Sequence, residues 1–259
     1  MGELVLVERR DAVRVLTFNR PEKLNALSTP MLEELEGALD EAKADTATRV
    51  LIVTGAGERA FVAGADIGEY SEQTDEAFDA FQRFCRRLFD SLDAFPKPVI
   101  GAVNGYALGG GFEIALCCDV LIASTAARFG LPEGRLGLSP GGGGTQRLTR
   151  AAGPFVAADV LLSARRLTAD EALRAGIVAE VVEPDALLDA ALAKAGEIVR
   201  AAPLAVGGML ELVRVGMDAA LAEGLDAEHD ALVRLRRTAD AAEGVSAFVE
   251  KREPRFEGN

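Results

Sequence analysis

The 259-residue sequence has no tryptophan and a single histidine, His229. This histidine lies in a charged segment, between Glu228 and Asp230, so we expect it to be a solvated surface residue. With only one histidine, a Ser-His-Asp or Cys-His mechanism has little to build on. The sequence also lacks an HExxH motif, a cluster of cysteines and histidines, and an Asp-rich loop. We therefore expect no metal site.

Cysteine is scarce, and long apolar runs are missing. Cys85 stands alone, and Cys117 and Cys118 are adjacent, which suits neither a disulfide framework nor a CxxC metal site. This usage favours a reducing, cytoplasmic location. No apolar stretch approaches the roughly 20 residues of a membrane span. The first residues turn charged within a few positions, unlike a secretory signal peptide. We expect no membrane span.

Positive charge is also limited. The 28 Lys and Arg residues are outnumbered by 41 Asp and Glu residues, which gives a net charge of -13. Because no Lys/Arg-rich run is present, the electrostatic term that dominates nucleic-acid binding would be missing. We expect no nucleic-acid partner. An anionic small molecule would need a local basic patch.

Short apolar runs of strand length are the main positive signal. Residues 4–9 and 12–19 are close enough to form a hairpin, and a loop over residues 20–28 follows. Three more apolar runs that end in turn residues are typical of buried strands, at 49–55, 98–105 and 119–124. With 49% hydrophobic residues, the chain can bury a large core.

Helices alternate with these strands. One should begin with Thr29 as its N-cap and Pro30 in the first helical position. Apolar residues at helical spacing predict an amphipathic helix over about 75–94. After about residue 185 strand patterns stop, and Ala-rich amphipathic segments continue, with breaks near Pro203 and Gly216. The pattern predicts an α/β fold with a helical C-terminal subdomain.

One carboxylate stands out because of its apolar surroundings. Glu113 follows three glycines in the stretch GYALGGGFEIALCCDVLIAS, residues 105–124. A buried, unpaired carboxylate is costly, so Glu113 should have a partner or a chemical role. Glu133 lies twenty residues later, between Pro132 and Gly134. Two carboxylates facing one cavity would form an acid/base pair, although Glu133 could equally be an ordinary exposed loop acid.

Two glycine-bearing turns could supply backbone donors. The glycines of ALGGGFE precede a helix, where N–H groups lack intrahelical partners. Small residues in FVAGADIGEY would let a ligand approach the backbone. Together these turns could form an oxyanion hole, although each could also be a tight connection without a ligand. The glycines at 141–144 lack a following GKS or GKT, so a turn that leads into a helix is favoured over a phosphate loop.

In combination, these motifs resemble the enoyl-CoA hydratase/isomerase, or crotonase, family. The segments appear in the family's order and spacing over nearly the whole chain: FVAGADI, AVNGYALGGGFEIALCCDVLIA, FGLPE, GLSPGGGGTQRLTRAAG and AEGVSAFVEKREPRF. The resemblance implies a crotonase-type spiral of repeated ββα units over residues 1–195. It also implies a C-terminal helical trimerisation region over 196–259 and a homo-oligomer, either a trimer or a hexamer.

The resemblance also implies an activity, that of an enoyl-CoA hydratase acting on trans-2-enoyl-CoA. The backbone N–H groups of Ala65 and Gly110 correspond to the oxyanion donors. Glu113 corresponds to the base that activates water for attack at C3, and Glu133 to the acid that protonates C2. No metal or redox cofactor is implied, since coenzyme A is part of the substrate. Further residues correspond to substrate-binding positions, namely Lys23, Ala63, Asp66, Ile67 and Lys251, with the two lysines expected near the phosphates of coenzyme A.

Two other readings stay open. An enoyl-CoA isomerase, or another acyl-CoA-transforming relative, could use the same frame without adding water. A non-catalytic acyl-CoA-binding protein would keep the oxyanion turns but would not need two acids. Acyl-chain length, pathway and physiological direction are not specified by the residues.

Overall fold

The computed structural model describes residues 3–71 and 73–259, which fold around two β-sheets. The larger sheet has six strands: β1 (Val5–Arg10), β2 (Val13–Phe18), β3 (Val50–Gly55), β5 (Val99–Val103), β7 (Val120–Ser124) and β10 (Glu180–Val182), in this spatial order. Strands β1 and β2 form the expected antiparallel hairpin, whereas the later neighbours are parallel. The three predicted buried runs form β3, β5 and β7.

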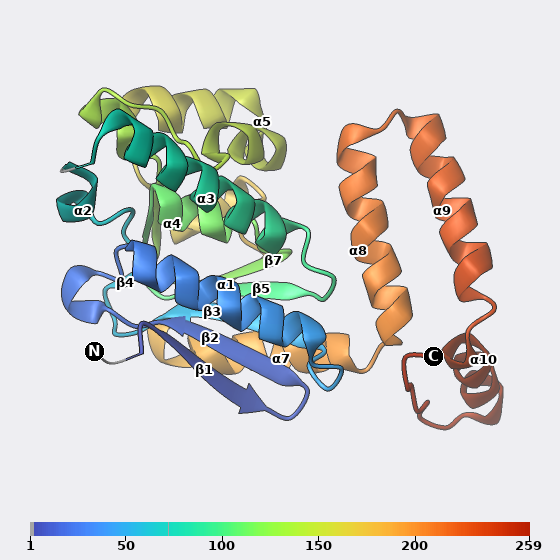
Figure 1. Cartoon of the computed structure of the whole chain (residues 1–259). Coiled ribbons are helices and arrows are strands. Elements are labelled where there is room, and N and C mark those ends of the chain that lie inside the picture. The colour runs from blue at the N-terminus through green and yellow to red at the C-terminus, as the bar shows by residue number, and fades with distance from the viewer. Residues whose placement is uncertain (1–2, 72) are drawn as a thin grey trace.

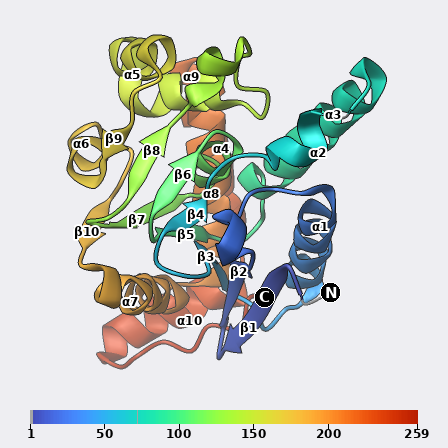
Figure 2. The same cartoon turned by 90° about the vertical axis from the view of Figure 1, so that its left-hand side faces the viewer.

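The smaller sheet contains strands too short for the sequence pattern to reveal. They are β4 (Ala60–Val62), β6 (Tyr106–Leu108), β8 (Arg128–Gly130) and β9 (Leu167–Thr168). Strands β4, β6 and β8 run parallel to one another and lie side by side (Figure 2). The chain passes repeatedly from the larger sheet to the smaller one and returns through helical segments, which confirms the spiral of ββα units.

Helices cover both faces of the larger sheet (Figure 1). Those that precede the C-terminal segment are α1 (Thr29–Ala44), α2 (Ile67–Ser71), α3 (Asp75–Asp93), α4 (Gly110–Ala115), α5 (Gly144–Ser163), α6 (Ala169–Arg174) and α7 (Leu187–Val199). Short 3-10 turns are η1 (Pro21–Lys23), η2 (Pro132–Leu136) and η3 (Pro184–Ala186). Helix α3 matches the predicted range within one residue.

The predicted start of α1 was wrong by one position. Ser28, with extended backbone angles of φ -112° and ψ 158°, is the N-cap, and Thr29 is the first helical residue. The Thr29 backbone N–H instead donates to Glu69 Oε2 at 3.0 Å. Pro30 still lies within the first turn, where its missing N–H costs no intrahelical bond.

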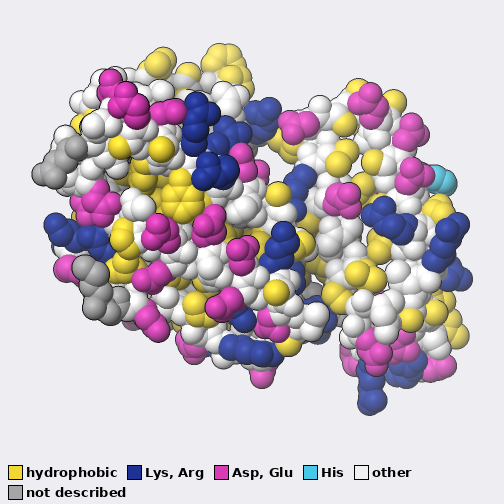
Figure 3. Space-filling model, in the orientation of Figure 1, with side chains coloured by type: hydrophobic (Ala, Val, Ile, Leu, Met, Phe, Trp, Pro, Cys, Tyr) yellow, Lys and Arg dark blue, Asp and Glu magenta, His cyan; other side chains and the backbone are white. Residues whose placement is uncertain are grey.

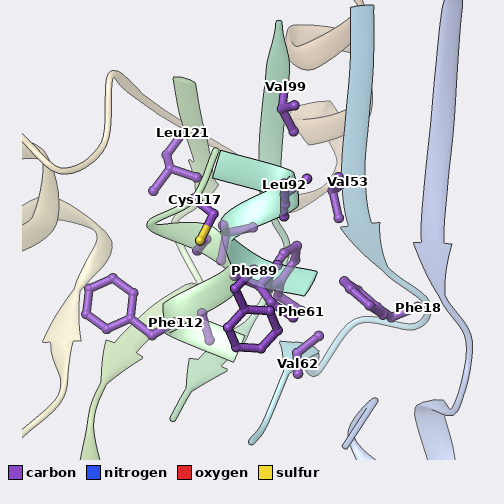
Figure 4. Packing of buried hydrophobic residues seen from close by; sticks show 14 of the residues in the cluster. Phe18, Val53, Phe61, Val62, Phe89, Leu92, Val99, Phe112, Cys117 and Leu121 are labelled. Carbon is purple, nitrogen blue, oxygen red and sulfur yellow. The ribbon is translucent and has the colours of Figure 1, made fainter. Parts of the chain in front are cut away.

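The core has two parts, one on each face of the larger sheet. On one side, side chains of the sheet pack with α1, α3 and α4, and Figure 4 shows Phe18, Phe61, Phe89 and Phe112 from four elements in this cluster. On the other side, the sheet packs against α7, which contributes small residues such as Ala191. The expected boundary between residues 195 and 196 falls inside α7.

Three helices follow the core, α8 (Pro203–Asp218), α9 (Leu221–Leu235) and α10 (Ala239–Glu250), and they extend to one side of it (Figure 1). The predicted break near Gly216 is present a few residues later, since α8 ends at Asp218 and α9 begins at Leu221. Arg214 attaches α8 to the core by donating to Phe95 O and to Asp119, each at 3.1 Å. In the part of the chain that the structure describes, no helix is both long and apolar enough to cross a bilayer.

Candidate active site

A cavity of about 370 Å³ lies between helix α3 and the turns that follow strands of the smaller sheet. It is lined by both predicted acids and by several of the other predicted site residues, namely Ala63, Ala65, Ile67, Gly110, Glu113 and Glu133. These residues follow the ends of β4, β6 and β8. Because the three strands are parallel neighbours, their carboxyl ends meet at one edge of the smaller sheet. Ligand sites commonly form at such edges.

The two glycine-bearing turns are in contact with each other. Gly64 has a φ of +95° and Gly109 a φ of +52°, a region of backbone space that favours glycine. A side-chain carbon on Gly109 would lie 3.6 Å from the Gly64 Cα. Gly111 could not carry a side chain at all, because it packs directly on the backbone of Val62. Close packing of backbone on backbone therefore brings the turns after β4 and β6 together.

Within the described part of the chain, this arrangement leaves two backbone N–H groups without an acceptor. The backbone N–H of Leu27 donates to Gly64 O, and its carbonyl oxygen accepts from Asp66 N, both at 2.8 Å. These two hydrogen bonds use the residues on either side of Ala65 and leave the N–H of Ala65 itself unused. Gly110 is the first residue of α4, where an N–H has no intrahelical acceptor. Neither N–H donates to another group among the described residues, and both residues line the cavity. An oxygen bound there could accept from both.

Glu113 is almost completely buried, with 4% of its surface exposed, and its partners are backbone amides. Its Oε1 accepts hydrogen bonds from the N–H groups of Gly142 and Gly144, each at 2.8 Å. Burial raises the pKa of this carboxyl, while the two amides and the charges of Arg147 and Arg86 oppose the rise. A carboxylate held by one oxygen can still use the other as a base.

The glycine run at 141–144 fits closely around Glu113. A side-chain carbon on Gly142 would lie 2.7 Å from Glu113 Oε2, and one on Gly144 would lie 3.1 Å from Glu113 Cγ. Gly143 has a φ of +108°, which a residue with a side chain rarely adopts. The run leads into α5, as the sequence predicted. Its role in holding Glu113 was missed, since nothing local shows which acid lies opposite.

Glu133 lies in η2 and has a different environment. It is partly buried, and its Oε2 is buried with no hydrogen-bond partner among the described residues. Burial, with a smaller contribution from the charge of Glu113, raises the pKa of Glu133 to about 7. Its Oε1 would lie 3.1 Å from a side-chain carbon on Gly109, which puts it beside the oxyanion turns. Glu133 can therefore hold a proton near neutral pH.

Three of the predicted substrate-binding residues do not line the cavity. Asp66 is paired with Arg20 at 2.9 Å, which lowers the pKa of Asp66, and it also accepts from Gly68 N at 3.1 Å. Lys23 is exposed at the end of η1, in the loop that leads to Leu27 of the cavity wall. Lys251 is exposed at the C-cap of α10. The role of both lysines at the phosphates of coenzyme A stays a prediction.

Sequence reasoning missed most of the apolar wall. Helix α3 contributes Phe78, Phe81, Gln82, Cys85 and Phe89, and the segment after η2 contributes Leu138 and Ser139. The helical spacing predicted an apolar face, but such a face can contact either a core or a ligand cavity. Burial raises the pKa of the Cys85 thiol to about 12, so it is a poor nucleophile at neutral pH. His229 is exposed, as predicted.

Known proteins resemble the chain over its full length. Residues 8–259 match the family described as enoyl-CoA hydratase/isomerase. A short-chain-enoyl-CoA hydratase of Clostridium acetobutylicum is 44% identical over 96% of this chain and 95% of that protein. A 2,3-dehydroadipyl-CoA hydratase of Escherichia coli is 44% identical over the whole of both chains. The crystal structure of an enoyl-CoA hydratase from Bacillus anthracis superposes with a TM-score of 0.97 at 38% identity, covering 99% of this chain and 100% of that one.

The chain thus shares its mixed α/β fold with proteins that are named as hydratases of enoyl-CoA thioesters. The chain belongs to the enoyl-CoA hydratase/isomerase family.

Proposed function

We propose that the protein is an enoyl-CoA hydratase, a hydro-lyase that adds water to trans-2-enoyl-CoA to give 3-hydroxyacyl-CoA. The observation that carries this proposal is the pair of carboxyl groups in one cavity with opposite environments. Glu113 is held by two amide N–H groups, whereas burial raises the pKa of the unpartnered Glu133 to about 7. The names of the similar proteins, both hydratases of enoyl thioesters, support it.

In the proposed mechanism the thioester oxygen accepts hydrogen bonds from the N–H groups of Ala65 and Gly110. These donors are already in place, so they stabilise the negative charge that develops on the oxygen as the enolate forms. The Glu113 carboxylate removes a proton from a water molecule that attacks C3, and the protonated Glu133 delivers a proton to C2. C3 gains the hydroxyl group of water and C2 gains the proton of Glu133, and the proton taken up by Glu113 must return to Glu133 before the next turnover, so that one water molecule is added in total. No metal or redox cofactor is needed.

Purified protein with trans-2-enoyl-CoA in ¹⁸O-labelled water tests this proposal. We expect 3-hydroxyacyl-CoA that carries the label, and loss of the absorbance of the conjugated thioester. The reverse dehydration should occur at the same site. If the protein leaves 2-enoyl-CoA unhydrated but rapidly converts 3-enoyl-CoA to 2-enoyl-CoA, it is an isomerase. Binding without turnover of either substrate would mean an acyl-CoA-binding protein.

The two acids can be tested separately. We expect Glu113→Gln and Glu133→Gln each to lower kcat by roughly 10²- to 10⁴-fold, the usual contribution of a positioned acid or base. Glu36→Gln, at an exposed position on α1, is the matched control and should leave kcat unchanged. A variant that keeps the wild-type kcat would remove its residue from the mechanism.

The proposed assembly is a trimer or hexamer of this chain. The C-terminal helices expose large apolar side chains, including Leu221, Leu232 and Phe248 with 78%, 67% and 84% of their surfaces exposed. Apolar side chains recur over α8 and α9 on the face shown in Figure 3. A second copy of the chain offers the same face, and burying both would remove these residues from water.

Light scattering at micromolar concentration tests this assembly. The wild-type protein should be a trimer or hexamer, and Phe248→Glu should shift it toward smaller species. Val7→Glu, a similar change at an exposed position of β1, should have no effect. A monomeric wild-type protein would refute the assembly. The proposed cytoplasmic setting is supported by three free cysteines, of which Cys85 and Cys117 are buried.

A further inference from the structure

The side chain of Arg147 packs under the glycine run that holds Glu113, and the proposed mechanism assigns it no role. Arg147 lies in the first turns of α5, and its side chain is only 14% exposed. Its Nη1 donates to Gly142 O at 2.8 Å, and its backbone N–H donates to Gly143 O at 2.9 Å. Arg147 itself is not part of the cavity wall. Its connection to a substrate would therefore be indirect.

Gly142 connects the guanidinium to the catalytic carboxylate. Its carbonyl oxygen accepts from Arg147, and its N–H donates to Glu113 Oε1. Four consecutive glycines form a backbone with unusual conformational freedom, so this geometry needs an external restraint. A side-chain carbon on Gly143 would collide with Arg147 Nη1, which shows how closely the guanidinium fits the loop. Holding the Gly142 carbonyl fixes the peptide plane between Gly142 and Gly143, and this restrains the short segment whose two ends, the N–H groups of Gly142 and Gly144, donate to Glu113.

The guanidinium is anchored in turn to α3. Arg147 Nη2 donates to Asp90 Oδ1 at 2.8 Å and to Asp93 Oδ2 at 3.2 Å. Asp90 also accepts from Arg86 Nε at 2.7 Å. A planar guanidinium can bridge a carbonyl and two carboxylates in a fixed geometry, which a lysine ammonium cannot reproduce. The anchor therefore depends on the shape of the arginine side chain as well as on its charge.

The charge of Arg147 also acts on Glu113. Burial raises the pKa of Glu113, and Arg147 and Arg86 lower it. The other titratable groups near Glu113 are Cys85 of α3, Cys117 just after α4, and Glu133 of η2, each of which feels its charge. Removing the Arg147 charge should raise the pKa of Glu113 further and reduce the fraction of the carboxylate that can act as a base.

We propose that Arg147 is a positioning residue. Its guanidinium group holds the Gly142 carbonyl and thereby orients the N–H groups of Gly142 and Gly144, which hold Glu113 in place as the base. Its kinetic consequences rest on the proposed hydratase function. The role makes separate demands on shape and charge. The planar shape of the guanidinium is needed to orient the glycine run and hence for kcat, whereas its positive charge is needed to keep Glu113 ionised.

Three variants separate these demands. Arg147→Met should lower kcat by about 10- to 100-fold, the effect of a small misplacement of a reacting group, with KM nearly unchanged. It should also move the acidic limb of kcat/KM to higher pH. Arg147→Lys should lower kcat but keep the acidic limb in place, because the charge remains. Arg150→Met is the control, since Arg150 is also on α5 and pairs with Asp218 at 3.4 Å, away from the loop.

A readout independent of activity is the titration of Glu113 itself. In protein labelled with ¹³C at glutamate carboxyl carbons, the signal that disappears in Glu113→Gln identifies Glu113. Its midpoint should be higher in Arg147→Met than in the wild type, even if the hydratase assay fails and the proposed function falls. An unchanged midpoint together with an unchanged kcat would overturn the role of Arg147. If Arg147→Met does not fold, Asp93→Asn and Arg147→Lys test the proposal in its place, and we expect each of them to have a lower kcat than the wild type.

Discussion

The free energy of unfolding of Glu133→Gln, relative to that of the wild type, should be higher at neutral and alkaline pH than in acid. Burial raises the pKa of Glu133 from its ordinary value of 4.5 to about 7. Below about 4.5 the carboxyl is neutral in both the folded and the unfolded chain. As the pH rises toward 7, the unfolded chain ionises first, so the wild-type fold loses stability that the glutamine variant keeps. Above 7 the difference becomes constant.

The size of this effect follows from the pKa rise. At 1.36 kcal/mol for each unit of pKa, the rise from 4.5 to about 7 corresponds to about 3 kcal/mol before screening by solvent is considered. Glu133 is only partly buried and lines a cavity that water can enter, so screening reduces the expected difference to about 1–2 kcal/mol. The amide of the glutamine adds a constant term that does not change with pH. The measured quantity is therefore the change in the difference between the two proteins, and not its absolute value.

Urea unfolding at a series of pH values from about 4 to about 8 measures this change. Protein concentration must be fixed, because assembly contributes to apparent stability. Glu36→Gln, at an exposed position on α1, controls for the loss of one negative charge from a protein of net charge -13. A difference between Glu133→Gln and the wild type that stays flat across the series would refute the reasoning, since it would mean that Glu133 is solvated in the folded protein.

Three further predictions concern the same cavity. In the proposed mechanism Glu133 must be protonated, so kcat/KM should fall as the pH rises above about 7. A pH-rate profile measures this alkaline decrease, and Glu133→Gln should not show it. Gly142→Ala would place a carbon 2.5 Å from the Phe89 ring, so we expect a loss of about 1–3 kcal/mol in urea unfolding and a kcat decrease, whereas Gly37→Ala, in open space on α1, should be tolerated. Cys85, whose thiol pKa is about 12 because of burial, should resist iodoacetamide near neutral pH when labelling is followed by mass spectrometry, and rapid labelling would contradict its burial.

The sequence was informative where a pattern is long or a motif is specific. The apolar runs that form β3, β5 and β7 could be recognised because a strand buried on both faces is apolar throughout. Helix α3 could be recognised from its spacing over 19 residues. Strands of three residues, such as β4 and β8, are too short to show a period, so the smaller sheet came only from the family resemblance. The end of α8 was predicted to within about two residues, and the helix continues past Gly216 to Asp218.

The candidate site divides in a similar way. Glu113 could be singled out because an acid in an apolar run needs an explanation, and the structure supplies one in the amides of Gly142 and Gly144. Those partners are about thirty positions away in the chain, and no local pattern links them. Arg147 was equally invisible, because its importance depends on a carbonyl and two aspartates from other elements. Pairings of this kind are set by tertiary packing, which a single sequence does not display.

The parallel pairing of β4, β6 and β8 has a consequence for how this cavity can change over evolution. Ala65, Gly110 and Glu133 each follow a different one of these strands. Hydrogen bonding fixes neighbouring strands roughly 4.8 Å apart, so the backbone origins of the three groups are spaced by the sheet and not by side-chain packing. A substitution at position 133 can remove or exchange the carboxyl group without moving the N–H groups of Ala65 and Gly110, which belong to the backbone and survive any side-chain change except one to proline. Changing the distance between their origins would instead require an insertion or deletion in a turn, and the chemistry can therefore diversify much more readily than the frame that carries it.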